Sequence, residues 1–133
     1  MHRLPLRVYY EDVDLAGVVY YANYLRFYER GRSEAIRALG IDQVAMRSAG
    51  LVFVVTRIAA DYLSPARFDD LIEVVTETAR VGGASIEMRQ RIERDGATLN
   101  RAEVKAACMD LSGRPARLPA EVRARLAASV PAA

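Results

Sequence analysis

Residues 9–34 read YYEDVDLAGVVYYANYLRFYERGRSE, and this stretch contains the change from strand to helix on which the fold depends. The overlapping residues 4–11 are rich in β-formers and predict a first strand, which an acidic loop follows. From Tyr20 to Leu39, apolar residues recur every three or four positions, and Gly40 follows at the position of a C-terminal cap. The pattern predicts one long helix of about five turns. Gly31 interrupts its apolar stripe, which predicts that another backbone passes close by.

The sequence after this helix has the period of β-strands, once a short second helix capped by Asp42 has ended near residue 50. Gly82-Gly83 and Asp95-Gly96 separate neighbouring runs and are expected to supply the positive φ of tight hairpins. The order of one strand, one long helix and four strands predicts an α+β fold, with one antiparallel sheet of about five strands wrapped around a central helix. A short surface helix is expected over residues 119–128. The four strand-like runs are LVFVVTRIAADYL, LIEVVTETARV, ASIEMRQRIER and ATLNRAEVKAACMDL.

The composition limits the classes of protein to which the chain can belong. A length of 133 residues with 52% hydrophobic residues fits a single domain over residues 1–133 with one ordinary core. The 19 basic and 17 acidic residues leave a net charge of +2, so the chain lacks the one-sided charge that nucleic-acid binding requires. A small anionic ligand remains compatible with this balance.

Two residue types that occur once each narrow the chemistry further. Cys108 is the only cysteine, which excludes an internal disulfide and a cysteine metal cage, and we expect it to fill the core. His2 is the only histidine and lies at a terminus that we expect to be loose, which argues against a histidine base. We therefore expect neither a metal nor a cofactor. No signal peptide and no run of about 18 apolar residues is present, so we expect no transmembrane segment and a cytoplasmic location.

The junction of the acidic loop with the long helix is the candidate site of chemistry. The first N–H groups of a helix have no internal acceptor and can hold an oxyanion. A carboxylate in the preceding loop can act as nucleophile or as general base. An aspartate at such a position also commonly caps a turn or helix, so spacing alone leaves both roles open for Asp12 and Asp14.

The string DVDLAGVVYYANYLRFYERGRSE, residues 12–34, resembles a family signature. It is similar to the pattern D-x-D-x-x-G-V/I-V-Y/F, followed by an N-Y pair and an acidic-basic helix, of the hot-dog thioesterases. These are the enzymes related to 4-hydroxybenzoyl-CoA thioesterase and the Tol-Pal-associated acyl-CoA thioesterases. The segments YLSPARFDD at 62–70 and RPARLP at 114–119 are also similar, so the resemblance covers essentially the whole chain.

The resemblance implies a hot-dog fold and hydrolysis of a short aliphatic or aromatic acyl-CoA to the free acid and coenzyme A. It implies that Asp14 is the catalytic carboxylate, that Gly17 forms a tight turn and that the backbone N–H of Tyr21 is the oxyanion donor. Asn23 and Tyr24 match the N-Y pair, for which we expect packing beside the substrate. Many Tol-Pal-associated members have histidine where this chain has Tyr21, so the chemistry here is expected to proceed without imidazole. Asp12 is expected to hold the loop.

The phosphates of coenzyme A require local cations or backbone N–H groups. The candidates are Arg80, Arg114 and Arg117, together with Gly82, Gly83 and Ser85 of one turn. For each arginine, a solvated position on a strand face is the open alternative.

The expected assembly is a homodimer or homotetramer, because a single sheet around one helix leaves an edge strand and apolar surface uncovered. The resemblance adds that the sites lie at the dimer interface.

Two other functions remain possible on this fold. A hydratase or dehydratase acting on an acyl thioester resembles the chain less well, because those enzymes use a catalytic histidine and only His2 is present. A non-catalytic acyl-CoA-binding or regulatory module would need no carboxylate beside the helix start. Release of free thiol from acyl-CoA distinguishes an enzyme from such a module.

Overall fold

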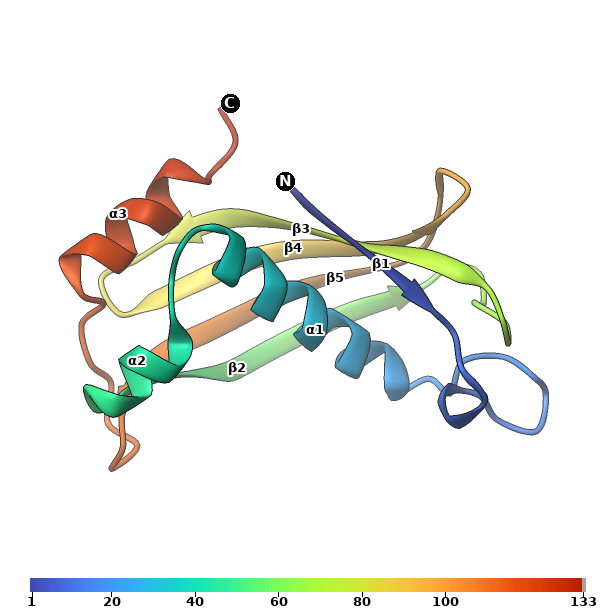
Figure 1. Ribbon diagram of the computed structural model, residues 1–133, viewed down its shortest axis with the longest axis horizontal. Coiled ribbons are helices and arrows are strands. Elements are labelled where there is room, and N and C mark those ends of the chain that lie inside the picture. The colour runs from blue at the N-terminus through green and yellow to red at the C-terminus, as the bar shows by residue number, and fades with distance from the viewer. Residues whose placement is uncertain (133) are drawn as a thin grey trace.

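The predicted α+β architecture, one antiparallel sheet with a long helix against it, is confirmed by the computed structural model, which describes residues 1–132 and leaves position 133 of the predicted domain outside the described residues. Five antiparallel strands form one sheet in the order β1-β3-β4-β5-β2, and helix α1 lies across one face of it (Figure 1). The elements are β1 His2–Arg7, the 3-10 turn η1 Tyr10–Asp12, α1 Asn23–Ala38, α2 Gln43–Ser48, β2 Leu51–Tyr62, β3 Leu71–Val81, β4 Ser85–Arg94, β5 Ala97–Asp110 and α3 Ala120–Ala128.

The first strand and the long helix are both shorter than predicted. Strand β1 ends at Arg7 rather than at residue 11, because the chain turns into η1 and the Asp12 carboxylate accepts a 2.8 Å hydrogen bond from the Tyr9 N–H. Helix α1 begins at Asn23 rather than at Tyr20, because residues 20–22 form a turn. The periodic pattern therefore includes residues of the loop before the helix, namely Tyr20 and Tyr21.

The two predicted hairpins differ in their backbone geometry. Asp95 and Gly96 have φ values of 51° and 80°, which confirms a left-handed turn between β4 and β5. The prediction of positive φ at Gly82-Gly83 was wrong. The Gly82 N–H donates to the Ser85 carbonyl at 2.7 Å, so the central pair of this turn is Gly83 and Ala84 rather than the two glycines.

The core lies between α1 and the sheet, and Gly31 marks the closest approach. A Cβ at Gly31 would lie 2.5 Å from Val74 Cγ1 and 3.1 Å from both Gln90 Nε2 and Thr76 Oγ1. The predicted close approach is therefore present, but to side chains of β3 and β4 rather than to another backbone. Gln90 also donates a 2.9 Å hydrogen bond to the Tyr28 carbonyl, which ties the middle of α1 to the sheet.

Three local predictions, for Asp42, Cys108 and His2, can be compared with the structure. Asp42 caps α2 as predicted, since its carboxylate accepts from the N–H groups of Val44 and Ala45. Cys108 is fully buried, which confirms its place in the core. His2 was expected on a loose terminus, but it pairs with Thr76 in the sheet and is half-buried. Over residues 1–132, no helix is long and apolar enough to cross a bilayer.

The sheet has two distinct ends, which we name by what they carry. At the loop end, where β2 finishes and β3 begins, lie the loop of residues 8–22, the start of α1 and the segment 63–70 (Figure 1). At the distal end, where β2 begins, lie the β3–β4 turn and α3 (Figure 1). The distinction matters because the predicted site residues divide between these two ends.

Candidate active site

The acidic loop is a narrow hairpin that ends in a tight turn. The Asp14 N–H donates to the Val18 carbonyl at 3.0 Å, and the Tyr20 N–H donates to the Asp12 carbonyl at 2.9 Å. The Gly17 N–H donates to the Asp14 carbonyl at 3.0 Å, and Gly17 has a φ of 74°. An aspartate at the first position and a glycine at the fourth are typical of such a turn. The loop therefore presents Asp14 on a rigid hairpin.

The Asp14 side chain is exposed, and its two oxygens are used differently. Oδ1 accepts a 2.8 Å hydrogen bond from the Ala16 N–H, which holds the turn. Oδ2 accepts no hydrogen bond from any of residues 1–132. The turn-capping role that spacing suggested is thus present, and one carboxylate oxygen remains free for a substrate.

Asp12, two residues earlier, is buried and fully engaged within the protein. Its Oδ2 accepts from the Tyr9 N–H at 2.8 Å, and its Oδ1 accepts from Asn23 Nδ2 at 3.0 Å. The amide of Asn23 is therefore directed at the acidic loop, where it joins the helix start to Asp12. The two aspartates are separated by environment: Asp12 holds the loop, and Asp14 faces solvent.

The start of α1 has N–H groups without acceptors. The Asn23 N–H donates to the Tyr20 carbonyl at 2.8 Å. Within residues 1–132, the N–H groups of Tyr21 and Ala22 donate to no acceptor. The Tyr21 side chain is 65% exposed, and its ring packs against that of Tyr20 at a centroid distance of 4.9 Å. The partial positive charge of the helix start is thus available beside the acidic loop.

Tyr24 lies beneath this junction and links it to the segment 63–70. Its hydroxyl accepts a 3.0 Å hydrogen bond from the Ala66 N–H, and burial raises the pKa of the phenol above its ordinary value. In the same segment, the Ala66 carbonyl accepts a hydrogen bond from the Val19 N–H, and the Phe68 N–H donates to the Gly17 carbonyl. Tyr24 is therefore a buried support of the loop.

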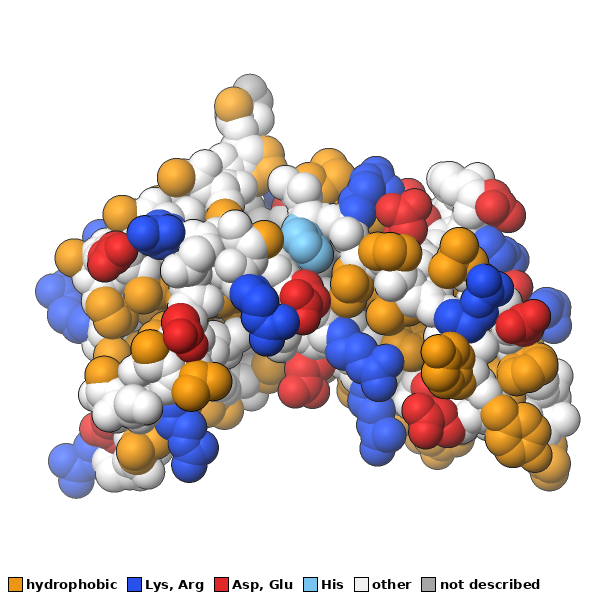
Figure 2. Space-filling view, in the orientation of Figure 1, with side chains coloured by type: hydrophobic (Ala, Val, Ile, Leu, Met, Phe, Trp, Pro, Cys, Tyr) orange, Lys and Arg blue, Asp and Glu red, His pale blue; other side chains and the backbone are white. Residues whose placement is uncertain are grey.

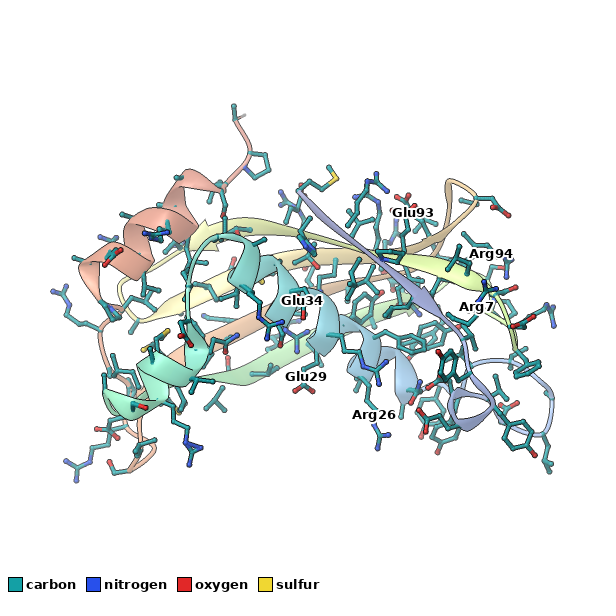
Figure 3. All side chains as sticks on the ribbon, viewed as in Figure 1. Arg7, Arg26, Glu29, Glu34, Glu93 and Arg94 are labelled. Atoms are coloured by element: carbon teal, nitrogen blue, oxygen red, sulfur yellow. The ribbon has the colours of Figure 1, made fainter. Side chains whose placement is uncertain are left out.

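The segment 63–70 is in turn fixed by two arginines that the sequence did not single out. Arg94 Nη1 lies 2.6 Å from Asp70 Oδ2, and Arg7 Nη1 donates to the Asp69 carbonyl at 2.7 Å. Figure 3 shows Arg7 and Arg94 at the loop end of the sheet. In the sequence, the Asp69-Asp70 pair is the feature that could have indicated a turn supported by arginines. Asp69 has a φ of 69°, which aspartate tolerates in a turn better than most residues.

The predicted coenzyme A residues lie at the distal end instead. Gly82, Gly83 and Ser85 form the β3–β4 turn, and Arg80, Arg114 and Arg117 are exposed around it. For these three arginines, no carboxylate of residues 1–132 lies within ion-pair distance. Within one protomer the structure therefore does not bring these residues to Asp14.

The surface around the loop end carries exposed aromatic side chains, such as Tyr20 and Phe68, together with charged ones such as Asp14. Figure 2 shows large hydrophobic side chains over the loop end, among basic and acidic ones, and further hydrophobic side chains at the opposite end of this face. A crevice of about 350 Å³ lies between α1 and the edge strand β2. Its lining includes Arg32, Ser33 and Ile36 of α1 and Phe53, Val54 and Val55 of β2.

Residues 1–132 contain no group of three His, Cys, Asp or Glu side chains that could hold a metal ion.

Known proteins match this chain over most of its length. Residues 8–126 match the family model of the Thioesterase-like superfamily. The chain is 47% identical over 122 residues to the acyl-CoA thioesterase YbgC of Haemophilus influenzae, with 90% of each chain covered. It is 42% identical over 124 residues to the acyl-CoA thioester hydrolase YbgC of Escherichia coli, with 92% of each covered.

A solved structure agrees with these matches. The crystal structure of a probable thioesterase from Bartonella henselae superposes with a TM-score of 0.84 at 38% identity, covering 89% of this chain and 98% of that one. Fold, family model and relatives therefore agree: the chain belongs to the thioesterase-like superfamily and is an acyl-CoA thioesterase of the YbgC type with the hot-dog fold.

Proposed function

We propose that Asp14 attacks the thioester carbonyl of an acyl-CoA, or activates water to do so, while the backbone N–H of Tyr21 holds the developing oxyanion. Two observations together carry this proposal: one carboxylate oxygen of Asp14 accepts no hydrogen bond, and the N–H groups of Tyr21 and Ala22 at the start of α1 have no acceptor. Asp14 lies on a short hairpin, and the N–H groups of Tyr21 and Ala22 directly follow that hairpin at the start of the helix. Electrostatic stabilisation by such preorganised donors commonly contributes more than any other single effect to the acceleration of acyl transfer.

Either route of hydrolysis balances without an imidazole. In the nucleophilic route, an Asp14 oxygen bonds to the carbonyl carbon, the C–S bond breaks with the thiolate of coenzyme A as leaving group, and water then hydrolyses the mixed anhydride. In the general-base route, Asp14 takes a proton from water, whose oxygen bonds to the carbonyl carbon as the C–S bond breaks. A tyrosine phenol has a pKa of about 10, so Tyr21 contributes its main chain rather than a base.

The substrate class that we propose is a short aliphatic or aromatic acyl-CoA. The support is the gathering of apolar and aromatic side chains at the loop end, which includes Tyr20, Tyr21 and Phe68. The crevice between α1 and β2 offers about 350 Å³ of further space along the helix. Comparison of kcat/KM across a panel of aliphatic and aromatic acyl-CoAs, with thiol release as the readout, tests this assignment.

We also propose a homodimer joined through β2, either alone or paired into a homotetramer. Strand β2 pairs with β5 on one side, and its long outer edge includes Val54 and Val55, which are 40% and 45% exposed. Such an edge presents unpaired N–H and C=O groups that can pair with a strand of another chain. Antiparallel pairing about a two-fold axis would place the distal end of one subunit beside the loop end of the other. The proposed coenzyme A residues of one subunit would then lie near Asp14 of its partner.

Two substitutions at Tyr21 test the oxyanion proposal, because one changes the side chain and the other removes the N–H. Tyr21→Phe should keep kcat within about tenfold of wild type, since the main-chain donor remains. Tyr21→Pro should lower kcat by about 10² or more. If Tyr21→Phe were as inactive as Asp14→Asn, the phenol would be a direct participant, and the backbone-donor proposal would be abandoned.

A further inference from the structure

Two main-chain hydrogen bonds hold the turn that precedes α1, but neither involves the peptide unit between Tyr21 and Ala22. The Asn23 N–H bonds the Tyr20 carbonyl at 2.8 Å, and the Tyr20 N–H bonds the Asp12 carbonyl at 2.9 Å. Neither bond reaches the peptide unit between Tyr21 and Ala22. That unit carries one of the unpartnered N–H groups and directly follows the other.

This peptide unit is held from a different element, the edge strand. Tyr62 is the last residue of β2, and its hydroxyl donates a 2.6 Å hydrogen bond to the Tyr21 carbonyl. The two residues are 41 positions apart, so the bond depends on the tertiary fold. Burial, with a smaller contribution from Tyr21, raises the pKa of Tyr62 above its ordinary value. The phenol therefore keeps its proton and remains a donor at neutral and mildly alkaline pH.

The ring that carries this hydroxyl is itself fixed. Tyr62 packs edge-to-face on Tyr24, with centroids 5.3 Å apart and planes at 85°. The Tyr24 hydroxyl accepts from the Ala66 N–H, and Tyr62 lies opposite Asn100 in the register of β2 with β5. Packing and strand register together restrict the positions that the Tyr62 hydroxyl can take.

We propose that Tyr62 is a positioning residue of the oxyanion hole. A hydrogen bond to a peptide carbonyl fixes the plane of that peptide and polarises its N–H. The Tyr62 hydroxyl thus orients the Ala22 N–H, the second unpartnered donor at the helix start, toward the charge that develops in the transition state. This inference rests on the proposed function, since it requires that the helix start holds an oxyanion.

Tyr62→Phe tests the inference, because it keeps the ring and its contact with Tyr24 but removes the donor. Tyr21 is exposed, so water replaces the lost bond at its carbonyl and little stability is lost. We expect kcat to fall about tenfold and KM to stay within about twofold. The midpoint of thermal unfolding and the mass by light scattering should match wild type. Ser48→Ala is the matched control, because it removes an exposed hydroxyl that donates to a main-chain carbonyl in α2, away from the loop end, and it should leave all four quantities unchanged.

Three results would overturn the inference. These are a wild-type kcat in Tyr62→Phe, a rise in KM at unchanged kcat, or a loss of activity that follows a lower unfolding midpoint and is recovered on cooling. The Tyr21→Pro variant separates this failure from failure of the proposed function. An inactive Tyr21→Pro beside a fully active Tyr62→Phe refutes only the role of Tyr62, whereas a fully active Tyr21→Pro refutes the Tyr21 N–H as the oxyanion donor of the proposed function.

Discussion

The carboxylate of Asp12 and the amide of Asn23 are joined by a buried 3.0 Å hydrogen bond, which ties the acidic loop to the first residue of α1. The second oxygen of Asp12 accepts from the Tyr9 N–H, so both oxygens must act as acceptors. Asp12→Asn replaces one of them with a donor. We expect the free energy of unfolding to fall by about 1–3 kcal/mol, because a buried donor or acceptor then lacks a partner.

Urea denaturation measures this loss, with Asp14→Asn as the matched control. Asp14 is exposed and its turn needs only one acceptor, which asparagine retains, so Asp14→Asn should change stability little. Equal stability of Asp12→Asn and wild type would show that the buried bond to Asn23 does not hold the loop.

Gly31 is the position at which the helix and the sheet tolerate no added atom. Gly31→Ala should gain about 1 kcal/mol of helix propensity but lose more, because its methyl would lie 2.5 Å from a fully buried, β-branched Val74. We expect a net loss of about 1 kcal/mol in the free energy of unfolding. In the double variant with Val74→Ala, the loss should be smaller than the sum of the two single losses, and strict additivity would contradict the contact.

The buried pair of Tyr28 and Asn100 predicts a decrease in stability at alkaline pH. The Tyr28 hydroxyl donates to Asn100 Oδ1 at 2.5 Å, and burial raises its pKa far above the ordinary value of about 10. Above about pH 10, the unfolded chain loses this proton while the folded chain keeps it, so the unfolded state binds fewer protons. Stability is therefore full below about pH 10 and falls as the pH rises toward the folded-state pKa.

Urea denaturation of wild type and Tyr28→Phe between about pH 8 and about pH 11 measures this decrease. Tyr28→Phe should be less stable at about pH 8, because Asn100 loses its donor, and its stability should fall less steeply above about pH 10. The same slope in both proteins would mean that Tyr28 does not contribute to the alkaline loss.

The local part of the fold was predictable from sequence, because its determinants are close neighbours in the chain. Asp42 caps α2 through residues two and three positions on, and Asp95-Gly96 forms its hairpin from its own backbone. The start of α1 was placed three residues early. Aromatic periodicity continues through Tyr20 and Tyr21, whereas the turn before the helix is closed by the Asn23 N–H on the Tyr20 carbonyl and held by the Tyr20 N–H on the Asp12 carbonyl.

The long-range part of the site could not be predicted from pattern. The partner of Tyr21 is Tyr62, 41 positions away, and the partner of Tyr24 is Ala66, 42 positions away. No periodicity relates residues at such separations. The amide of Asn23 likewise bonds a loop aspartate that a sequence motif does not identify as its partner.

The edge of β2 predicts an assembly that one charge can disrupt. A lysine on an exposed edge opposes strand pairing between chains, so Val55→Lys should convert the proposed dimer to monomers of 14.7 kDa by light scattering at micromolar concentration. Val44→Lys adds the same charge to α2, at a position that is 77% exposed, and should leave the mass unchanged. A fully active wild-type monomer would refute the proposal that two subunits share each site.

The central claim is that Asp14, and not Asp12, carries the chemistry, and the turnover of Asp14→Asn tests it most directly. The measurement is the release of coenzyme A thiol from a saturating acyl-CoA by wild type and Asp14→Asn, each shown to be folded by its unfolding midpoint. Our account predicts that kcat of Asp14→Asn falls by about 10² or more, because neither a nucleophile nor a base remains at that position. Equal kcat in the two folded proteins would contradict it.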